Sequence, residues 1–486
     1  MAFETVIGLE VHSQLLTRSK MYCSCAADYA STRPNSRVCP VCLGMPGVLP
    51  VINRKAVEFT IMTGMALNCA IAEHTKFDRK NYSYPDLVKG YQISQYDAPI
   101  ANGGWLDVDV NGTSHRVGIH RVHLEEDTAK LLHRHGMVES YSLVDMNRSG
   151  VPLMEIVSQP DMCSPEEARQ YLIKLRTILQ YLGVSTGNME EGSFRCDANI
   201  SLRPPGAPLP PAKVEIKNMN SFRAVFRAMT YEEERLGKLM TEGGRLVQET
   251  RGWVDERGET VLQRTKEEAH DYRYFPEPDL PPLEISASYV ENLRSRLPEL
   301  PDSRRQRYIN ELGLSDYDAG LVTQSRPLAD FFEQAIAENS PLAVPERAKK
   351  VANWLLGDFT RLLNATGTEI AELPVTPAHL MELVKLVEAG RLSGPAAKQV
   401  MEEMFISGGS PSQIMAQKGL EQMGGGRELE SAVVQAIQSN PQPVADYRNG
   451  KAQALTFLVG QVMRATRGRA NPQQARDVIM RVLEES

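Results

Sequence analysis

Five segments within the first 218 residues have the pattern of β-strands, and each places acids, histidine or basic groups on one face. They span residues 3–12, 118–127, 151–157, 193–203 and 213–217. For any single strand, a polar face exposed to water is a sufficient explanation, and it predicts an ordinary antiparallel sheet. Together the five faces are rich in acids and bases, which favours a site for metal, phosphate and charged substrate.

Four residues of these faces carry groups that can bind a cation or that need a charged partner. Glu10 and His12 share a face of the first segment, with backbones about 7 Å apart, so both can reach one cation. Glu125 lies on the polar face of the second segment, together with His123. Glu155 is the single carboxylate of an apolar segment, where an unpaired charge is costly. Glu155 therefore needs a cation or a hydrogen-bond donor.

Four of the seven cysteines form two close pairs, Cys23 with Cys25 and Cys39 with Cys42. This spacing lets four thiolates reach one tetrahedral zinc ion, and Gly44 permits the turn after the second pair. Two disulfides are the alternative, but a cytoplasmic chain would not keep them. The pattern predicts a zinc knuckle over residues 23–42, with a structural role because a four-cysteine site leaves no open position.

The length of 486 residues and a hydrophobic content of 42% predict a globular protein of about two to four domains. No run of about 18 apolar residues occurs, and the N-terminus begins directly with a strand pattern rather than a signal peptide. These features predict a cytoplasmic protein without a membrane partner. Neither a Gly-x4-Gly-Lys-Ser/Thr loop nor a Gly-x-Ser-x-Gly elbow is present, which argues against a P-loop and against nucleophilic acyl hydrolysis.

The pattern of elements changes along the chain. The first 280 residues mix strands, turns and a few helices, such as one that Ser164 caps and one that follows Asn220 or Ser221, which predicts an α+β domain. The proline-rich residues 271–282 must run extended, and a domain boundary is expected just beyond them. Residues 298–405 have a helical pattern, and residues 407–411 predict a flexible joint before a small helical unit.

Two segments are candidates for RNA contact, although the net charge of −7 does not favour nucleic-acid binding overall. Aromatic residues at 272–275 can stack on an unpaired base or form an edge packed on the core. Residues 441–486 carry seven basic and four acidic residues, a local charge of +3. A helix from about 451 to 466 ends in clustered arginines. These arginines either compensate the negative end of the helix dipole or bind RNA phosphates. The predicted RNA contacts are Lys451, Arg464, Arg467 and Arg469.

A series of longer strings covers essentially the whole chain: ETVIGLEVH (4–12), CPVCLGMPG (39–47), FDRKNY (77–82), YPD (84–86), HLEED (123–127), PLME (152–155), MEEGSFRCDAN (189–199), VEIKN (214–218), QETR (248–251), DYRYFP (271–276) and FLVGQVM (457–463). In this order they resemble the B subunits of bacterial glutamyl/aspartyl-tRNA amidotransferases. The resemblance implies an α+β cradle domain on an antiparallel sheet over residues 1–295, a helical linker domain over 296–407 and a helical tail domain over 408–486 that meets the tRNA.

The resemblance also implies an ATP-dependent ligase. The carboxylate of Glu on glutamine tRNA, or of Asp on asparagine tRNA, is phosphorylated and then amidated. Ammonia comes from glutamine through a partner amidase (A) subunit, and a small C subunit completes the heterotrimer. The family pattern does not distinguish the two misacylated tRNAs.

By the same resemblance, Glu10, His12, Glu125 and Glu155 form the catalytic Mg²⁺ site. An ionised carboxylate needs no general base to accept a phosphoryl group, but the negative charges must be neutralised. Imidazole is an unusual ligand for so hard a cation, so His12 either binds through water or serves the substrate. The residues expected to bind the ATP phosphates are Arg79, Lys80, Arg195 and Lys217. Asp197 and Glu215 are candidates to support a second cation.

Two other classes of function remain open from the residues. A non-catalytic RNA-binding translation protein would use the zinc knuckle and the basic tail, and would not depend on Glu10 or Glu155. An ATP-dependent ligase for a small carboxylic acid would leave the basic tail without a role.

Overall fold

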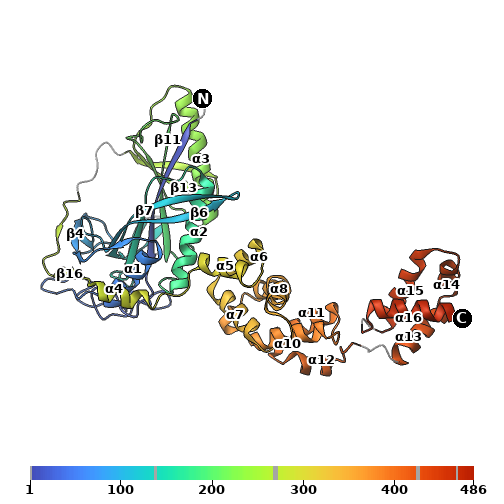
Figure 1. Ribbon diagram of the computed structural model, residues 1–486. Coiled ribbons are helices and arrows are strands. Elements are labelled where there is room, and N and C mark those ends of the chain that lie inside the picture. Colours follow the sequence, from blue (N-terminus) through green and yellow to red (C-terminus); the bar gives the residue numbers. More distant parts are fainter. Residues whose placement is uncertain (1–2, 136–139, 266–271, 423–426, 467–468, 486) are drawn as a thin grey trace. The chain divides into compact units, whose positions relative to one another are not determined.

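A nine-stranded sheet is the frame of the N-terminal part of the chain (Figure 1). Neighbouring strands run antiparallel, except β12 and β13, which run parallel. In spatial order the strands are β14 (Glu259–Thr265), β13 (Glu249–Val254), β12 (Val214–Lys217), β11 (Phe194–Arg203), β1 (Glu4–Gln14), β10 (Pro152–Ser158), β7 (Thr113–Glu126), β6 (Ala101–Val110) and β2 (Ala70–Ile71).

The five strand segments expected from the sequence are β1, β7, β10, β11 and β12. They are also neighbours in space, in the order β12-β11-β1-β10-β7. The prediction of an antiparallel sheet with α+β character is therefore confirmed. Because the five strands are adjacent and in register, their separate polar faces form one continuous surface.

The computed structural model describes residues 3–135, 140–265, 272–422, 427–466 and 469–485. The chain divides into two compact units, Met1–Leu300 and Pro301–Ser486. No helix among these residues is both long and apolar enough to cross a membrane. The domain cuts expected at 295 and 407 stay predictions.

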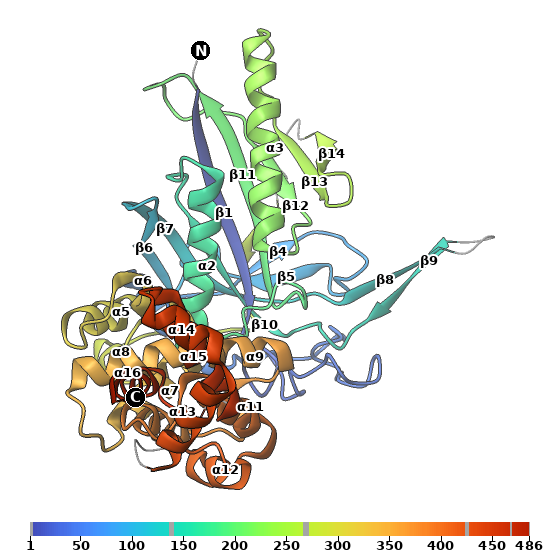
Figure 2. The ribbon, with the colours of Figure 1, turned by 90° about the vertical axis from the view of Figure 1, so that its right-hand side faces the viewer.

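Helices cover the apolar face of the sheet. They are α1 (Arg54–Ala66), α2 (Pro165–Leu182) and α3 (Phe222–Thr241), and α2 and α3 lie side by side across the strands (Figure 2). Ser164 and Ser221 cap α2 and α3 through side-chain oxygens that accept hydrogen bonds from backbone N–H groups, as the sequence predicts. The core beneath them contains Ile7, Leu9 and Val11 of β1, each at most 1% exposed.

Smaller elements complete the first unit. The strands β4 (Asp78–Asn81) and β5 (Tyr91–Ser94) pair with each other, and β15 (Phe275–Pro276) pairs with β4. The hairpin of β8 (Lys130–His135) and β9 (Ser140–Asp145) extends away from the large sheet (Figure 2). The other elements are β3 (His74–Thr75), which pairs with β16 (Leu283–Glu284), and α4 (Ala287–Arg294).

The second unit is helical, as expected, and contains two hydrophobic cores. The first core draws on α5 (Pro301–Asn310), α6 (Asp316–Thr323), α7 (Arg326–Ala337), α8 (Val344–Trp354), the π-helical turn η1 (Leu355–Phe359), α9 (Thr360–Thr366), the 3₁₀ turn η2 (Ile370–Glu372), α10 (Pro377–Glu388), α11 (Gly394–Ser407) and α12 (Pro411–Lys418). The second draws on α13 (Arg427–Ser439), α14 (Pro441–Arg448), α15 (Ala452–Ala465) and α16 (Pro472–Glu485). In the first core α12 contacts α10 and α11, and residues 408–410 connect α11 to α12.

Gly104 on β6 offers a test of the packing between the sheet and the end of α1. A Cβ atom at this position would lie 2.3 Å from the backbone oxygen of Leu67, which cannot move without shifting the chain. We expect Gly104→Ala to destabilise the first unit by about 1–3 kcal/mol in urea unfolding. The matched control is Gly237→Ala on α3, whose Cβ would meet only Leu202 at 3.9 Å. Equal stability of the two variants would show that this contact is not tight.

Candidate active site

Three central strands bring two histidines and two glutamates together on the polar face of the sheet. His12 on β1 lies across from Glu155 on β10, and Glu155 lies across from His123 on β7. Glu125 is two residues beyond His123, so its side chain points to the same side. Strand pairing thus joins residues that are far apart in the sequence.

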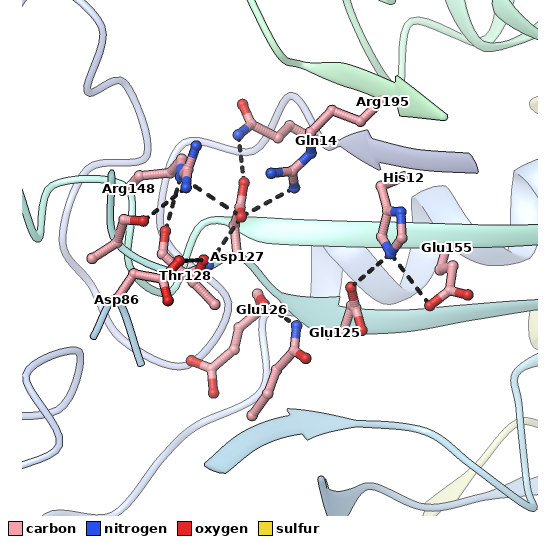
Figure 3. Close-up of polar contacts among 12 residues, drawn as sticks. His12, Gln14, Asp86, Glu125, Glu126, Asp127, Thr128, Arg148, Glu155 and Arg195 are labelled. Carbon is pink, nitrogen blue, oxygen red and sulfur yellow. Dashed lines mark hydrogen bonds and ion pairs between the residues drawn. The ribbon is translucent and has the colours of Figure 1, made fainter. Parts of the chain in front are cut away.

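The Nε2 atom of His12 lies 3.4 Å from Oε1 of Glu125 and 3.5 Å from Oε2 of Glu155 (Figure 3). We call His12, Glu125 and Glu155 the His12 cluster. Oε2 of Glu155 also lies 3.2 Å from Nε2 of His123. Both glutamates and His123 are buried, whereas the His12 side chain is 23% exposed. The cluster is therefore reachable from the His12 side.

Burial and charge oppose each other in the His12 cluster. Burial by itself would lower the pKa of His12, but the carboxylates of Glu155 and Glu125 raise it to about 10. Burial would raise the pKa of each glutamate, yet His12 lowers the pKa of Glu125, and His123 and His12 lower the pKa of Glu155 well below its usual value. Both carboxylates are therefore ionised at neutral pH.

Two buried carboxylates of this kind are stable only beside cations or strong donors. One ligand atom from each member of the His12 cluster lies within 4.8 Å of the others, so a single ion can reach all three. Mg²⁺ prefers carboxylate oxygens and keeps several waters, for which the exposed side of the cluster leaves access. The two carboxylates fit Mg²⁺, and the assignment of the ion and of His12 as a ligand stays a prediction.

The fourth expected ligand, Glu10, lies apart from the His12 cluster. Its Oε1 accepts a hydrogen bond of 3.0 Å from Nδ2 of Asn199 on β11. Among the described residues, its carboxylate is not part of the group whose ligand atoms converge. The common face of β1 was correctly expected, but the Glu10 carboxylate is turned toward Asn199 in this arrangement, so its ligation of the same ion stays a prediction.

Lys80 on β4, one of the residues expected to bind phosphate, interacts electrostatically with both glutamates of the His12 cluster. Burial by itself would lower the pKa of Lys80, but Glu125 and, to a smaller extent, Glu155 raise it. Its ammonium nitrogen lies 5.1 Å from the ring centre of Tyr272 and 5.8 Å from that of Tyr82. It forms no ion pair with any described residue, so its charge is available to an anionic substrate.

Arg195 belongs to a network around Asp127 beside the cluster (Figure 3). Oδ1 of Asp127 lies 3.1 Å from Nη2 of Arg195 and 3.7 Å from Nε of Arg148, and Gln14 donates a 2.7 Å hydrogen bond to Oδ2. Burial would raise the pKa of Asp127, but the two arginines lower it. Arg195 is thus held by a buried carboxylate, with part of its guanidinium group exposed.

Carboxylates also hold the other two residues expected to bind phosphate. Arg79 forms two hydrogen bonds, of 2.7 and 2.8 Å, with Glu277. Lys217 pairs with Asp197 and, at 3.1 Å, with Glu215. Lys217 therefore occupies the position between Asp197 and Glu215 at which a second cation was expected. No hydrogen bond or ion pair among the described residues joins Arg79 or Lys217 to the His12 cluster.

Two residues of the site had no role in the sequence analysis: His123, which contacts Glu155, and Asp127, which holds Arg195 and Arg148. His123 shares the polar face of β7 with Glu125, and Asp127 follows the last residue of β7 in the same alternation, so the alternation contained the signal. Their partners come from other segments of the chain, which the alternation does not identify.

The aromatic segment that follows residue 271 packs beside Lys80. Tyr274 stacks on Tyr96 with ring centres 4.2 Å apart, and Phe275 pairs with Arg79 across β15 and β4. This favours the interpretation of a packed edge over that of a free base-stacking surface. Asp271, which begins the string, lies outside the described residues.

The four cysteines of the knuckle converge, with ligand atoms within 4.8 Å of one another. Sγ of Cys39 and Sγ of Cys42 are 3.9 Å apart, close to the separation of about 3.8 Å that a tetrahedral site with Zn–S bonds of 2.3 Å requires. The cysteines are free, so the alternative of two disulfides is wrong. A hydrogen bond from Cys23, with help from Cys39 and Lys20, lowers the pKa of Cys42 to about 4, which suits a metal-bound thiolate.

The expected RNA contacts lie in the second unit, at the two ends of α15 and just after it. Lys451 forms a 3.0 Å ion pair with Asp446, and Nε of Arg469 donates to the backbone oxygen of Thr466. Arg464 is exposed in the last turn of α15. Arg467 lies outside the described residues. The tRNA-binding role of the four stays a prediction.

Comparison with known proteins places this site in context. A family model described as the GatB/GatE catalytic domain matches residues 5–291, which contain the His12 cluster and the knuckle, and a GatB domain model matches residues 330–483. The chain belongs to the GatB family. It is 57% identical to the B subunit of the aspartyl/glutamyl-tRNA(Asn/Gln) amidotransferase of Dehalococcoides mccartyi strain CBDB1, over 99% of each chain.

Other relatives have the same name and the same extent. The corresponding protein of Moorella thermoacetica is 56% identical over 97% of this chain and 98% of its own length. That of Thermoanaerobacter pseudethanolicus is 52% identical over the full length of both. The resemblance inferred from the sequence strings is thereby confirmed along the whole chain.

Direct ligation of Mg²⁺ by His12 can be tested by proton release. With a pKa of about 10, His12 is protonated at neutral pH in the metal-free protein, and it must lose this proton to bind an ion. We expect Mg²⁺ binding to release a proton, with an affinity that rises about tenfold per pH unit up to about pH 10. Calorimetry in two buffers of different ionisation enthalpy measures this, with His12→Gln as control. Binding without proton release would mean that His12 contacts the ion through water or serves the substrate.

The zinc assignment can be tested with matched serine variants. We expect Cys25→Ser to lose most of its zinc and to unfold at a lower temperature, because binding of a structural metal contributes directly to folding. Cys163→Ser is the control, since Cys163 is exposed and outside the cluster. Metal content by atomic emission and thermal unfolding are the measurements. Equal zinc content in the two variants would contradict the assignment.

Proposed function

We propose that this chain is the catalytic B subunit of a tRNA-dependent amidotransferase. It would convert Glu on glutamine tRNA, Asp on asparagine tRNA, or both, into the corresponding amide, with ATP and with glutamine as the nitrogen source. The observation that carries the proposal is the His12 cluster, a histidine and two buried, ionised carboxylates that converge on the sheet of a chain whose relatives bear this name.

The chemistry takes place in two steps. A carboxylate oxygen of the aminoacyl side chain bonds to the γ-phosphorus of ATP while the bond to the β-phosphate oxygen breaks, and ADP leaves. Ammonia then attacks the carbonyl carbon of the acyl phosphate, phosphate leaves with the C–O bonding pair, and the nitrogen loses a proton to give the amide. The carboxylate is ionised at neutral pH, so the first step needs positioning and charge neutralisation rather than a base.

His12, Glu125 and Glu155 would hold Mg²⁺, with Glu10 contributing through water. When bound, the ion neutralises the phosphates and orients them for in-line transfer. Lys80 adds a positive charge that no described carboxylate pairs with, and it can bind the γ-phosphate or the reacting carboxylate. The exposed edge of Arg195 can contribute in the same way, since Asp127 fixes its position. Arg79 and Lys217 would have to release their carboxylate partners before they could bind a phosphate of ATP.

The remaining parts of the chain support this reaction. The name of the relatives implies partner subunits, and we propose an amidase A subunit that supplies ammonia and a small C subunit. The knuckle would hold a structural zinc ion. Lys451, Arg464, Arg467 and Arg469 would bind tRNA phosphates in the tail. A role in translation agrees with a cytoplasmic location.

The experiment compares Glu155→Gln with the wild type in the reconstituted complex, using Glu-charged glutamine tRNA, or Asp-charged asparagine tRNA, and ammonium chloride. We expect phosphate release and amidated product to fall together by about 100-fold or more, because loss of one charged ligand removes stabilisation of the transferring phosphoryl group. The affinity for tRNA, measured by filter binding, should not change.

Glu256→Gln is the matched control, because Glu256 is exposed in the turn between β13 and β14. Full activity of Glu155→Gln would rule out the His12 cluster as the phosphorylation centre. A wild-type complex that never consumes ATP with either charged tRNA would rule out the proposed function as a whole.

A further inference from the structure

A cavity of about 270 Å³ lies on the polar face of the sheet, on the far side of Glu10 from His12. Strands β1, β10 and β11 form its floor, and segments around Pro160 and around Leu209 and Pro210 form its walls. Its lining is mostly apolar, with a few polar side chains. This composition is typical of a pocket that binds a flat organic group and orients it by a small number of hydrogen bonds.

Gly8 opens the floor of this cavity. It lies in the middle of β1, where the neighbouring residues are mainly branched apolar ones, and a glycine in a strand interior weakens the strand. No contact within the protein requires it: an added Cβ would lie 3.6 Å from Cα of Pro160, an ordinary distance. A glycine that the packing does not need is instead explained by the space that it leaves for a ligand.

Asn199 supplies an edge with both a donor and an acceptor. One N–H of its amide donates to Glu10 at 3.0 Å; within the described residues the second N–H has no acceptor and Oδ1 has no donor. An asparagine amide in this state can accept from the 6-amino group of adenine and donate to its N7. The hydroxyl groups of Ser158 and Ser201 instead donate to backbone oxygens of the protein.

The cavity also lies at a useful distance from the His12 cluster. Asn199 pairs with Gly8 across the strands, and Gly8 is four residues from His12 along β1, a separation of about 13 Å. Glu10 lies between them, where a carboxylate can accept hydrogen bonds from ribose hydroxyls. A base in the cavity would therefore place the 5′ or 3′ side of its ribose toward the cation site.

We propose that this cavity binds the adenine base of an adenosine that presents its reacting group to the His12 cluster. The proposal rests on the proposed function, which supplies two adenosines with the same recognition chemistry: that of ATP and the 3′-terminal adenosine of the charged tRNA. Prolines and aliphatic side chains pack on the faces of the base, and Asn199 binds its edge.

The test fills the cavity in steps with Gly8→Ala and Gly8→Val in the reconstituted complex. Valine favours strands, so the sheet should remain intact, which thermal unfolding checks. Gly237→Ala on the other side of the sheet is the control. Dissociation constants are measured for ATP, for intact charged tRNA and for tRNA without its terminal adenosine.

If the cavity holds the base of ATP, Gly8→Val weakens ATP binding by about tenfold or more and leaves tRNA binding unchanged. If it holds the terminal adenosine, the variant weakens only intact tRNA and leaves ATP unchanged. A folded Gly8→Val variant that binds all three ligands like the wild type overturns the proposal. If the wild type still consumes ATP with charged tRNA, the proposed function stands without it.

A second variant keeps the test decisive if Gly8→Val does not fold. We expect the wild type to prefer ATP over purine riboside triphosphate, which lacks the 6-amino group, and Asn199→Ala to lose that preference. For the tRNA source, tRNA ending in purine riboside takes the place of the triphosphate. No change in either preference overturns the role of Asn199 and the adenine assignment with it.

Discussion

The arrangement of the site depends on the free-energy cost of burying two ionised carboxylates on the central strands of the sheet. Glu125 and Glu155 are buried on central strands, and His12 and His123 lie within 3.5 Å of their carboxylates. A buried pair of carboxylates is stable only beside a cation. In the metal-free protein a protonated His12 supplies this positive charge. We propose that Mg²⁺, bound together with the phosphates of ATP, supplies it in place of the proton during the reaction. Stability and activity would thus share one electrostatic requirement.

The four cationic side chains expected to bind phosphate differ in whether a carboxylate of the protein already pairs with them. Arg195, Arg79 and Lys217 are each paired with carboxylates, whereas Lys80 lies among aromatic rings and pairs with no described carboxylate. A side chain whose charge is already neutralised must give up a partner before it binds phosphate, and this lowers its net contribution. The electrostatic arrangement therefore singles out Lys80 among the four cations that the sequence suggested.

The cavity beside Glu10 extends the site along β1. Gly8, Glu10 and His12 follow one another on the same face, so one strand would present a base pocket, a ribose contact and a cation ligand in succession. Such an arrangement would orient a nucleotide without a glycine-rich phosphate loop, which the chain lacks. The knuckle and the helical unit contain none of these groups, which agrees with roles in stability and in RNA binding.

The sequence by itself determined which residues share a face, because side chains alternate with a local period of two along each strand. It thus identified β1, β7, β10, β11 and β12, the polar side of each and the four knuckle cysteines. Only the tertiary structure decided that β10 lies between β1 and β7, so that Glu155 meets both His12 and His123 while Glu10 faces Asn199. It also decided that Lys217 fills the place expected for a second cation. Strand order and register depend on contacts between distant segments, which no local pattern encodes.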